Sequence, residues 1–375
     1  MAAPPTNQKK VSCRHSNYIH DDIVFSILSK LPVKSLKRFS CVHKSWINLF
    51  ENSTFINMFR NNLLFKSNSL YSDDDVYLIL NQYDWNYYFL YGDKFQSKFK
   101  LDLPYFDSID EEDDVNSISI LGSGINGILC IYDFNDNAEV VLWNPFLDEH
   151  MKVPYSLAEF PDESSTKISL HGFGYDHVRD DYKIIEHVAY SDAVLLDPFW
   201  EIYSLKSNSW RKINYDMPIG CLSASDVYLN GVCHWWGETN NKTCLVSFNL
   251  CDEVFLTTPS PLADVPDDGF DVQLMVLNGS IALISNQKET ASYQISTLGE
   301  FGVEESWIRL FDVELLSCEW PIGAGTKGKI FFRKEDDELA CFDLTTGLIE
   351  DIGFDAVFQV IHYKITFRSI GEINV

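Results

Sequence analysis

Two different hydrophobic patterns divide the chain. In residues 21–31 the apolar positions recur at three- and four-residue intervals, the spacing of one face of an α-helix. Asp21 or Asp22 can cap the first turn, and Pro32 ends the helix because the residue before a proline disfavours the α region. Similar spacing predicts further short helices in residues 33–50. The N-terminal part is therefore expected to be helical.

Beyond residue 66 the apolar positions form short runs rich in β-branched and aromatic residues, separated by Gly, Asn, Asp and Pro. Runs such as VYLIL, GILCIYDF and LVSFNL are typical of strands, and no convincing amphipathic helix of ten or more residues interrupts them. This larger part of the chain is therefore predicted to be mainly β.

A repeat becomes visible when the turns are aligned. SGINGILCIYD, DVYLNGVCHWWG, LMVLNGSIALIS and AGTKGKIFFRKE each contain a strand, a turn with glycine and a second strand. The turn glycines Gly127, Gly231, Gly279 and Gly328 lie 104, 48 and 49 residues apart, and HGFGYDHVRDDYKII, with a longer Asp-rich hairpin, fills the double interval. A period near 48 with about four strands is typical of β-propeller blades. An irregular β-sandwich would explain the strands but not the period.

The two ends of the repeat region predict how the ring closes. Residues 67–106 can form a first, degenerate blade, and the C-terminal run VFQVIHYKITF can supply a strand that pairs with it. Closure of this kind removes exposed sheet edges. Five to seven blades fit the length and six are favoured. The predicted fold class is mainly β: a short α-helical N-terminal segment followed by a β-propeller-like repeat domain of about six blades.

Charge separates the same two parts. The net charge is -26, yet residues 1–66 hold ten Lys or Arg against three Asp or Glu, which leaves 19 basic and 52 acidic residues for the rest. Such an acidic body repels phosphate, so neither nucleic acid nor a membrane is an expected partner. The sequence lacks a signal-peptide core and an 18-residue apolar stretch, and its nine cysteines lack a framework spacing. We therefore expect reduced thiols and a location in the cytoplasm or nucleus.

The helical segment looks incomplete by itself. Three short helices over about 35 residues cannot bury a self-sufficient core, although the segment is rich in large apolar side chains. Another protein could cover part of that surface. Alternatively, the helices pack onto the β domain.

The stretch DDIVFSILSKLPVKSLKRFSCVHKSWINLFENSTFINMF, within residues 19–59, resembles an F-box of the large plant F-box family. The shared features are an acidic cap, an apolar helix ending in Leu-Pro, and the run VKSL.RF.CV.KSW. In one departure, Ile19-His20 stands where the family usually has Leu-Pro, so the proline that pre-organises the helix start is missing.

The resemblance implies that the segment binds the Skp-type adaptor of an SCF (Skp-cullin-F-box) ubiquitin ligase, and through it the cullin and the RING subunit. By motif position, the residues expected to form or support the adaptor interface are Ile19, Ile23, Ile27, Leu28, Leu31, Pro32, Leu36, Val42 and Trp46.

The β region is similar to the plant F-box-associated interaction domain, which is described as kelch-like. The segments GFGYDHVRDDYKII, EIYSLKSNSWRKI, VYLNGVCHWW, LVSFNLCDEVF and ESWIRLF carry this resemblance in the family's order. The expected organisation is a flexible lead (1–17), an F-box (18–60) and an F-box-associated β-propeller-like domain (67–375).

No catalytic or metal-binding pattern competes with this interpretation. The spacing of the cysteines around Cys233-His234 differs from that of zinc ribbons, and there is no P-loop or Gly-x-Ser-x-Gly elbow. Neither a cofactor nor a metal is expected. The acidic runs at 72–75, 107–114, 264–271 and 334–338 are typical of solvated loops, or they line a rim that selects a basic substrate.

The sequence thus predicts a non-catalytic substrate receptor whose β domain captures an unknown target protein. The alternative is an F-box-bearing protein that sequesters partners without assembling an active ligase.

Overall fold

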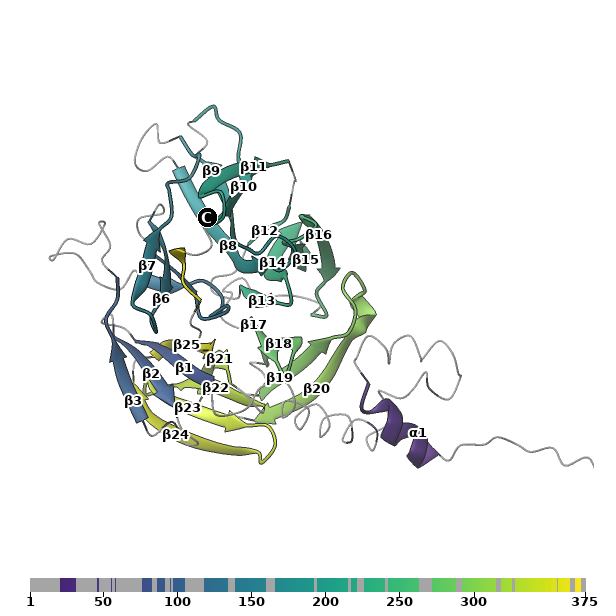
Figure 1. The fold of residues 1–375 in the computed structure, drawn as a ribbon. Helices are drawn as coiled ribbons and strands as arrows, with labels where there is room; N and C mark the ends of the chain where they lie inside the picture. The colour runs from purple at the N-terminus through teal and green to yellow at the C-terminus, as the bar shows by residue number, and fades with distance from the viewer. Residues whose placement is uncertain are drawn as a thin grey trace, which may run out of the picture.

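The computed structural model describes the following residues: 21–31, 46, 55, 58, 76–82, 86–91, 95, 97–104, 118–133, 139–159, 166–191, 194–214, 217–220, 226–239, 242–262, 272–287, 292–314, 318–325, 328–355, 357–364 and 368–371. These residues form one α-helix, α1 (Asp21–Leu28), and six antiparallel sheets arranged in a ring (Figure 1). The predicted lead (1–17) and most of residues 33–50 lie outside the described residues, and the predicted domain boundaries stay predictions.

Each sheet is one blade, and in five of the six blades the strands follow chain order. Blade 1 contains β1 (Val76–Gln82), β2 (Tyr87–Tyr91), β3 (Ser97–Leu101) and β25 (Val357–Lys364). Blade 2 contains β4 (Ile118–Ile120), β5 (Leu129–Asp133), β6 (Val140–Asn144) and β7 (Glu149–Lys152). Blade 3 contains β8 (Thr166–Asp176), β9 (Asp181–Tyr190), β10 (Phe199–Ser204) and β11 (Ser209–Ile213).

The other half of the ring is built in the same way. Blade 4 contains β12 (Ile219–Gly220), β13 (Val227–Leu229), β14 (Val232–Thr239), β15 (Lys242–Asn249) and β16 (Val254–Pro259). Blade 5 contains β17 (Val272–Leu277), β18 (Ser280–Gln287), β19 (Ser292–Leu298) and β20 (Trp307–Glu314), the last preceded by the 3₁₀ turn η5 (Glu304–Ser306). Blade 6 contains β21 (Cys318–Ala324), β22 (Lys329–Lys334), β23 (Glu338–Asp343) and β24 (Leu348–Asp355). The prediction of a mainly β, six-bladed propeller is confirmed.

The repeated glycines mark the turn between the first two strands of a blade. Asn230 and Gly231 have φ angles of 51° and 86°, and both belong to the left-handed region that a two-residue type I′ hairpin turn requires. Gly279 takes the same place in blade 5. In blade 3 the longer turn after β8 is held by Asp176, whose Oδ1 accepts hydrogen bonds of 3.0 Å from two backbone amides. The segment HGFGYDHVRDDYKII is therefore the missing copy of the repeat, as predicted.

The ring is closed by the C-terminal strand, as the sequence predicts. β25 pairs with β1 over its whole length, and Ile361 lies opposite Ile79. The Gln359 side chain then joins blade 1 to blade 2: its Nε2 donates to the carbonyl oxygen of Ile120 (2.7 Å), and its Oε1 accepts from the Ile120 amide (3.2 Å). Closure therefore combines strand pairing with a side-chain bridge across the seam.

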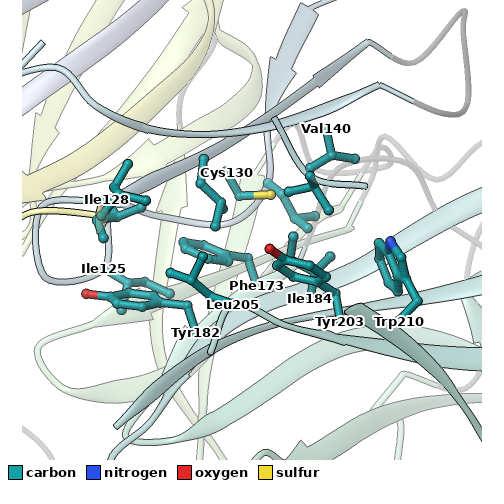
Figure 2. Packing of buried hydrophobic residues seen from close by; sticks show 14 residues of the cluster. Ile125, Ile128, Cys130, Val140, Phe173, Tyr182, Ile184, Tyr203, Leu205 and Trp210 are labelled. Carbon is teal, nitrogen blue, oxygen red and sulfur yellow. The ribbon is translucent and has the colours of Figure 1, made fainter. Parts of the chain in front are cut away.

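The hydrophobic core is divided among the spaces between blades. Six clusters of buried residues occur in the described part of the propeller, one between each pair of neighbouring blades. In the cluster between blades 2 and 3, Ile128, Cys130 and Val140 face Phe173 and Tyr203 (Figure 2). Six tryptophans of the propeller belong to or border such clusters: Trp200, Trp210, Trp235, Trp236, Trp307 and Trp320.

The segment after β25 ties the end of the chain to blades 2 and 3. The carbonyl oxygen of Arg368 accepts a hydrogen bond from Asn144 Nδ2 (3.1 Å), and Ile370 is buried in the cluster between these blades. The Arg368 guanidinium lies 5.0 Å from the centre of the Tyr175 ring and pairs with Asp180. The C-terminal segment thus reinforces a second seam of the ring.

Candidate partner-binding surfaces

Helix α1 has two apolar faces with different surroundings. Ile23 and Ile27 lie one helical turn apart on the same face, and their side chains are 55% and 56% exposed. Leu28 is buried, and the next residues close the helix with hydrogen bonds from Ser29 N to Phe25 O (2.8 Å) and from Leu31 N to Leu28 O (3.0 Å). One face of the helix is therefore covered and the other is exposed.

The covered face joins the helical segment to the propeller. Leu28 and Phe55 form a buried cluster with Ile308 and Leu310 of β20, the outermost strand of blade 5. We call these four residues the junction. Half-buried side chains border it: Val24, Phe25, Leu31, Trp46 and Phe311. The rings of Phe25 and Phe55 meet edge to face with centroids 5.6 Å apart. The alternative interpretation, that the helices pack onto the β domain, therefore holds for this face of α1.

Comparison with known families agrees with both parts of this arrangement. A model of the F-box domain matches residues 19–57, which include α1 and Phe55 of the junction. A model of the F-box associated beta propeller domain matches residues 93–369, which is more than half of the chain and most of the ring. The chain belongs to the F-box-associated β-propeller family. It is an F-box protein with a propeller interaction domain.

Relatives of this F-box protein occur in Arabidopsis thaliana. The chain is 26% identical over 297 residues to an F-box/kelch-repeat protein, and the match covers 78% of each chain. It is also 26% identical over 405 residues to the F-box protein CPR1, with 94% of this chain and 90% of that one covered. The second match extends over both the F-box and the propeller, because it covers 94% of this chain.

The structure places the predicted adaptor residues in two environments. Ile23 and Ile27 lie on the exposed face of α1, whereas Leu28 belongs to the junction and Leu31 and Trp46 border it. The remaining predicted residues lie outside the described part of the chain: Ile19, Pro32, Leu36 and Val42. Of the predicted adaptor residues that the structure describes, Ile23 and Ile27 thus expose the most apolar surface.

A buried charged network holds blades 3 and 4 together. Lys183 Nζ donates to Asp176 Oδ2 (2.8 Å), to the Leu250 carbonyl oxygen (2.7 Å) and to Glu253 Oε1 (2.8 Å). Burial opposes ionisation of Asp176, but the hydrogen bond from Lys183, with others from Cys251 and Arg179, outweighs it and keeps the pKa of Asp176 below its ordinary value. All three ammonium protons have acceptors, so this network joins the blades and leaves no free donor for a ligand.

Two buried carboxylates lie side by side in blade 3. Glu186 and Glu201 are opposite each other in the β9–β10 ladder, and both are buried. Glu201 accepts hydrogen bonds from the Ser156 hydroxyl and from the Leu157 amide (3.1 Å), whereas Glu186 Oε1 has no hydrogen-bond partner. Burial, and then the neighbouring Glu201, raise the pKa of Glu186 well above its ordinary value. Burial and the neighbouring carboxylate thus favour the protonated form of Glu186 inside the blade.

The one acidic run that lies within the described residues is neutralised locally. Lys334 pairs with Asp336 (3.5 Å), Glu338 (2.8 Å) and Asp351 (3.2 Å), and Arg333 pairs with Asp337. This agrees with a solvated loop rather than with a rim selecting a basic substrate. The runs at 72–75, 107–114 and 264–271 lie outside the described residues.

The described residues show neither a metal site nor a membrane-spanning helix. Within the described ranges no group of three or more His, Cys, Asp or Glu side chains could hold a metal ion. None of the six described cysteines forms a disulfide, and five of them are buried in the blades. No helix in the same part of the chain is long and apolar enough to cross a membrane.

Proposed function

We propose that this F-box protein is the non-catalytic substrate receptor of an SCF ubiquitin ligase in the cytoplasm or nucleus. In this proposal α1 binds the Skp-type adaptor, the adaptor links the chain to the cullin and the RING subunit, and the propeller captures a target protein. Tethering then raises the effective concentration of the target's lysines near the charged conjugating enzyme. The chain itself supplies binding and position rather than chemistry.

The observation that carries the proposal is the contrast between the two faces of α1. Its inner face is buried against β20, so the helix is held on the propeller. Its outer face leaves two isoleucines more than half exposed, one turn apart, in a segment that matches the F-box model. Exposed apolar side chains rimmed by charge are typical of interaction sites.

Reconstitution tests the proposal directly. The full-length chain is mixed with a purified Skp-type adaptor, a cullin and a RING subunit, and assembly is followed by size-exclusion chromatography with the adaptor omitted as control. We expect a single complex that depends on the adaptor and that forms ubiquitin chains when the activating and conjugating enzymes are added. Failure of the chain to bind the adaptor contradicts the proposal.

Partial assembly favours the sequestering alternative. If the adaptor binds but the complex fails to recruit the cullin, the chain holds partners without delivering them to a ligase.

A further inference from the structure

The rim between blades 4 and 5 exposes a set of large apolar side chains that the F-box does not explain. Val254 and Leu256 of β16 are 50% and 48% exposed, and Phe301 and Val303 of the β19–β20 turn are 38% and 39% exposed. We call these four residues the blade 4–5 patch. Single exposed apolar residues are ordinary on protein surfaces, whereas contiguous ones mark interaction sites.

Hydrogen bonding and ring stacking make the patch contiguous. Val254, Leu256 and Thr258 point to the same side of β16 because side chains alternate along a strand. The Gly302 amide donates to Thr258 Oγ1 (2.7 Å), which holds the β19–β20 turn against β16 (Figure 1). The turn then lies so close to β16 that a Cβ placed at Gly302 would come within 3.2 Å of Leu256.

Phe301 is supported from below by blade 4. Its ring stacks on His234 with centroids 5.1 Å apart and planes 21° from parallel. His234 is buried, and its Nδ1 lies 2.9 Å from Ser247 Oγ, which is the neighbour of Leu256 in the next strand. Burial lowers the pKa of His234 to about 3, so the surface under the ring is neutral at physiological pH. Phe301 and Leu256 thus belong to one continuous surface.

The turn that carries Phe301 and Val303 is rigid. The buried Ser306 hydroxyl lies 2.7 Å from the carbonyl oxygens of both Glu300 and Val303, to one of which its single proton is donated at a time, and it accepts from the Glu300 amide (3.0 Å). Trp307 Nε1 donates to the Pro259 carbonyl oxygen (3.2 Å) and ties the following strand to β16. A partner would therefore meet a preformed surface and lose less conformational entropy of the receptor on binding.

The rim of the patch is acidic. Glu300, Glu304 and Glu305 lie on the same turn, and Asp252 lies two residues before β16, whereas Glu253 is already paired with Lys183. Arg211, a basic side chain next to this rim, is paired with Glu253. Electrostatic complementarity therefore favours a partner that carries Lys or Arg beside its apolar side chains. A second copy of this chain would present the same acidic rim, and its net charge of -26 would oppose association.

We propose that the blade 4–5 patch is the docking site for the target, and that it takes a segment with apolar side chains flanked by Lys or Arg. This inference rests on the proposed function and deepens it by naming the surface and the chemistry of the target. The acidic rim of this site lies on described residues next to blades 4 and 5, outside the four predicted acidic runs.

Three labelled peptides of equal length test the recognition chemistry on the full-length chain by fluorescence anisotropy at near-physiological salt. The first alternates Leu or Phe with Lys or Arg, the second replaces the apolar residues by Ser, and the third replaces the basic residues by Glu. We expect the first to bind at least about tenfold more tightly than either other peptide. If the first and second peptides bind equally tightly, the apolar residues contribute nothing and binding is only nonspecific attraction between basic peptide and acidic chain. That result would overturn the proposal.

Variants of the receptor locate the site. The double change Leu256→Ser with Phe301→Ser should weaken binding of the first peptide by about tenfold or more, because truncating central anchor residues removes most of the binding energy. Glu304→Lys with Glu305→Lys should weaken it as well, and these exposed residues can be changed without touching the core. The matched control is Phe146→Ser in blade 2, at a phenylalanine that is 42% exposed, and it should leave binding unchanged.

Two results contradict the assignment. In the first, Phe146→Ser weakens binding of the first peptide as much as the double change does. In the second, sedimentation shows a dimer that only the double change disrupts, which would assign the patch to a second copy of the chain. The peptide assay contains no adaptor, so its result is independent of adaptor binding. If the chain binds the first peptide but does not bind the adaptor in the reconstitution, the ligase proposal is rejected and the docking site is kept. Adaptor binding without peptide binding would do the reverse.

Discussion

The propeller and helix α1 complete their apolar surfaces in different ways. Within the described residues of the propeller, each blade buries its faces against its two neighbours, and β25 closes the last seam with β1. Helix α1 has one face buried on β20 and one face exposed. The ring therefore provides its own partners, whereas α1 depends on the ring for one side and on another molecule for the other.

Strand β20 connects the two regions because different residues along it contact different neighbours. Ile308 and Leu310 belong to the junction, and Val313 belongs to the cluster between blades 5 and 6. Phe301 and Val303 of the blade 4–5 patch lie in the turn that leads into the same strand. The F-box attachment and the inferred target site are thus neighbours in blade 5, which would keep the distance between adaptor and target fixed.

Breaking the closing seam should have the largest effect. Ile361→Asp places a charge in the buried cluster between blades 1 and 2, and because both ring closure and packing are lost we expect no cooperative folded propeller. Urea unfolding followed by circular dichroism measures this. Ile349→Asp, at a residue that is 44% exposed on β24, is the control and should fold normally. A stable, cooperative Ile361→Asp propeller would show that closure is dispensable.

Weakening the contact between blades 3 and 4 without opening the ring should have an intermediate effect on stability. Asp176→Asn removes the charged acceptor of Lys183, which should lower the free energy of unfolding by about 2–3 kcal/mol at neutral pH. The pKa of Asp176 is depressed in the folded state, so this stabilisation is present above the ordinary pKa of 3.8 and is lost as pH falls below it.

The free energies of unfolding of the wild type and of Asp176→Asn should accordingly become equal at acidic pH. Asp312→Asn, which disrupts an exposed pair with Arg309, serves as control and should change stability by less than about 0.5 kcal/mol. An equal loss of unfolding free energy in both variants would mean that burial of the blade 3–4 network adds nothing to stability.

The smallest expected effect concerns the protonation of the buried Glu186 side chain in blade 3. Because the folded-state pKa of Glu186 is raised, the folded protein holds a proton that the unfolded chain releases as pH rises above 4.5, and stability falls with rising pH in that range. Glu186→Gln should flatten this slope and stabilise the protein slightly at neutral pH. Unfolding midpoints measured across a pH series check it, and a slope unchanged by the substitution would disprove the assignment.

The sequence predicts the propeller well because its signals are local and repeated. The Asn-Gly turns and the 48-residue period report single hairpins, and VFQVIHYKITF is recognisable as a strand without a partner of its own. The Glu186–Glu201 pair is not visible in this way, since it depends on the register between two strands. Phe301 is equally hidden, because a hydrophobic residue in a turn carries no periodic signal.

Helix α1 shows where pattern reasoning stops. Ile23, Val24, Ile27 and Leu28 make the helix apolar over a wide arc, and spacing alone does not say which part faces the propeller and which faces a partner. The motif resemblance groups Leu28 and Leu31 with the adaptor residues, while the structure places them at or beside the junction. That division depends on Ile308 and Leu310, which lie about 280 residues away in the sequence.

Calorimetric titration of the full-length chain with a purified Skp-type adaptor tests the division of α1 most directly. Ile23→Ser with Ile27→Ser should weaken adaptor binding at least about tenfold and leave the urea midpoint of the propeller unchanged, because these side chains contact neither blade nor junction cluster. Ile308→Ser, on the other side of the helix, should leave adaptor affinity within about threefold of the wild type. Unchanged affinity in the first variant, or equal losses in both, would contradict the two-faced account of the helix.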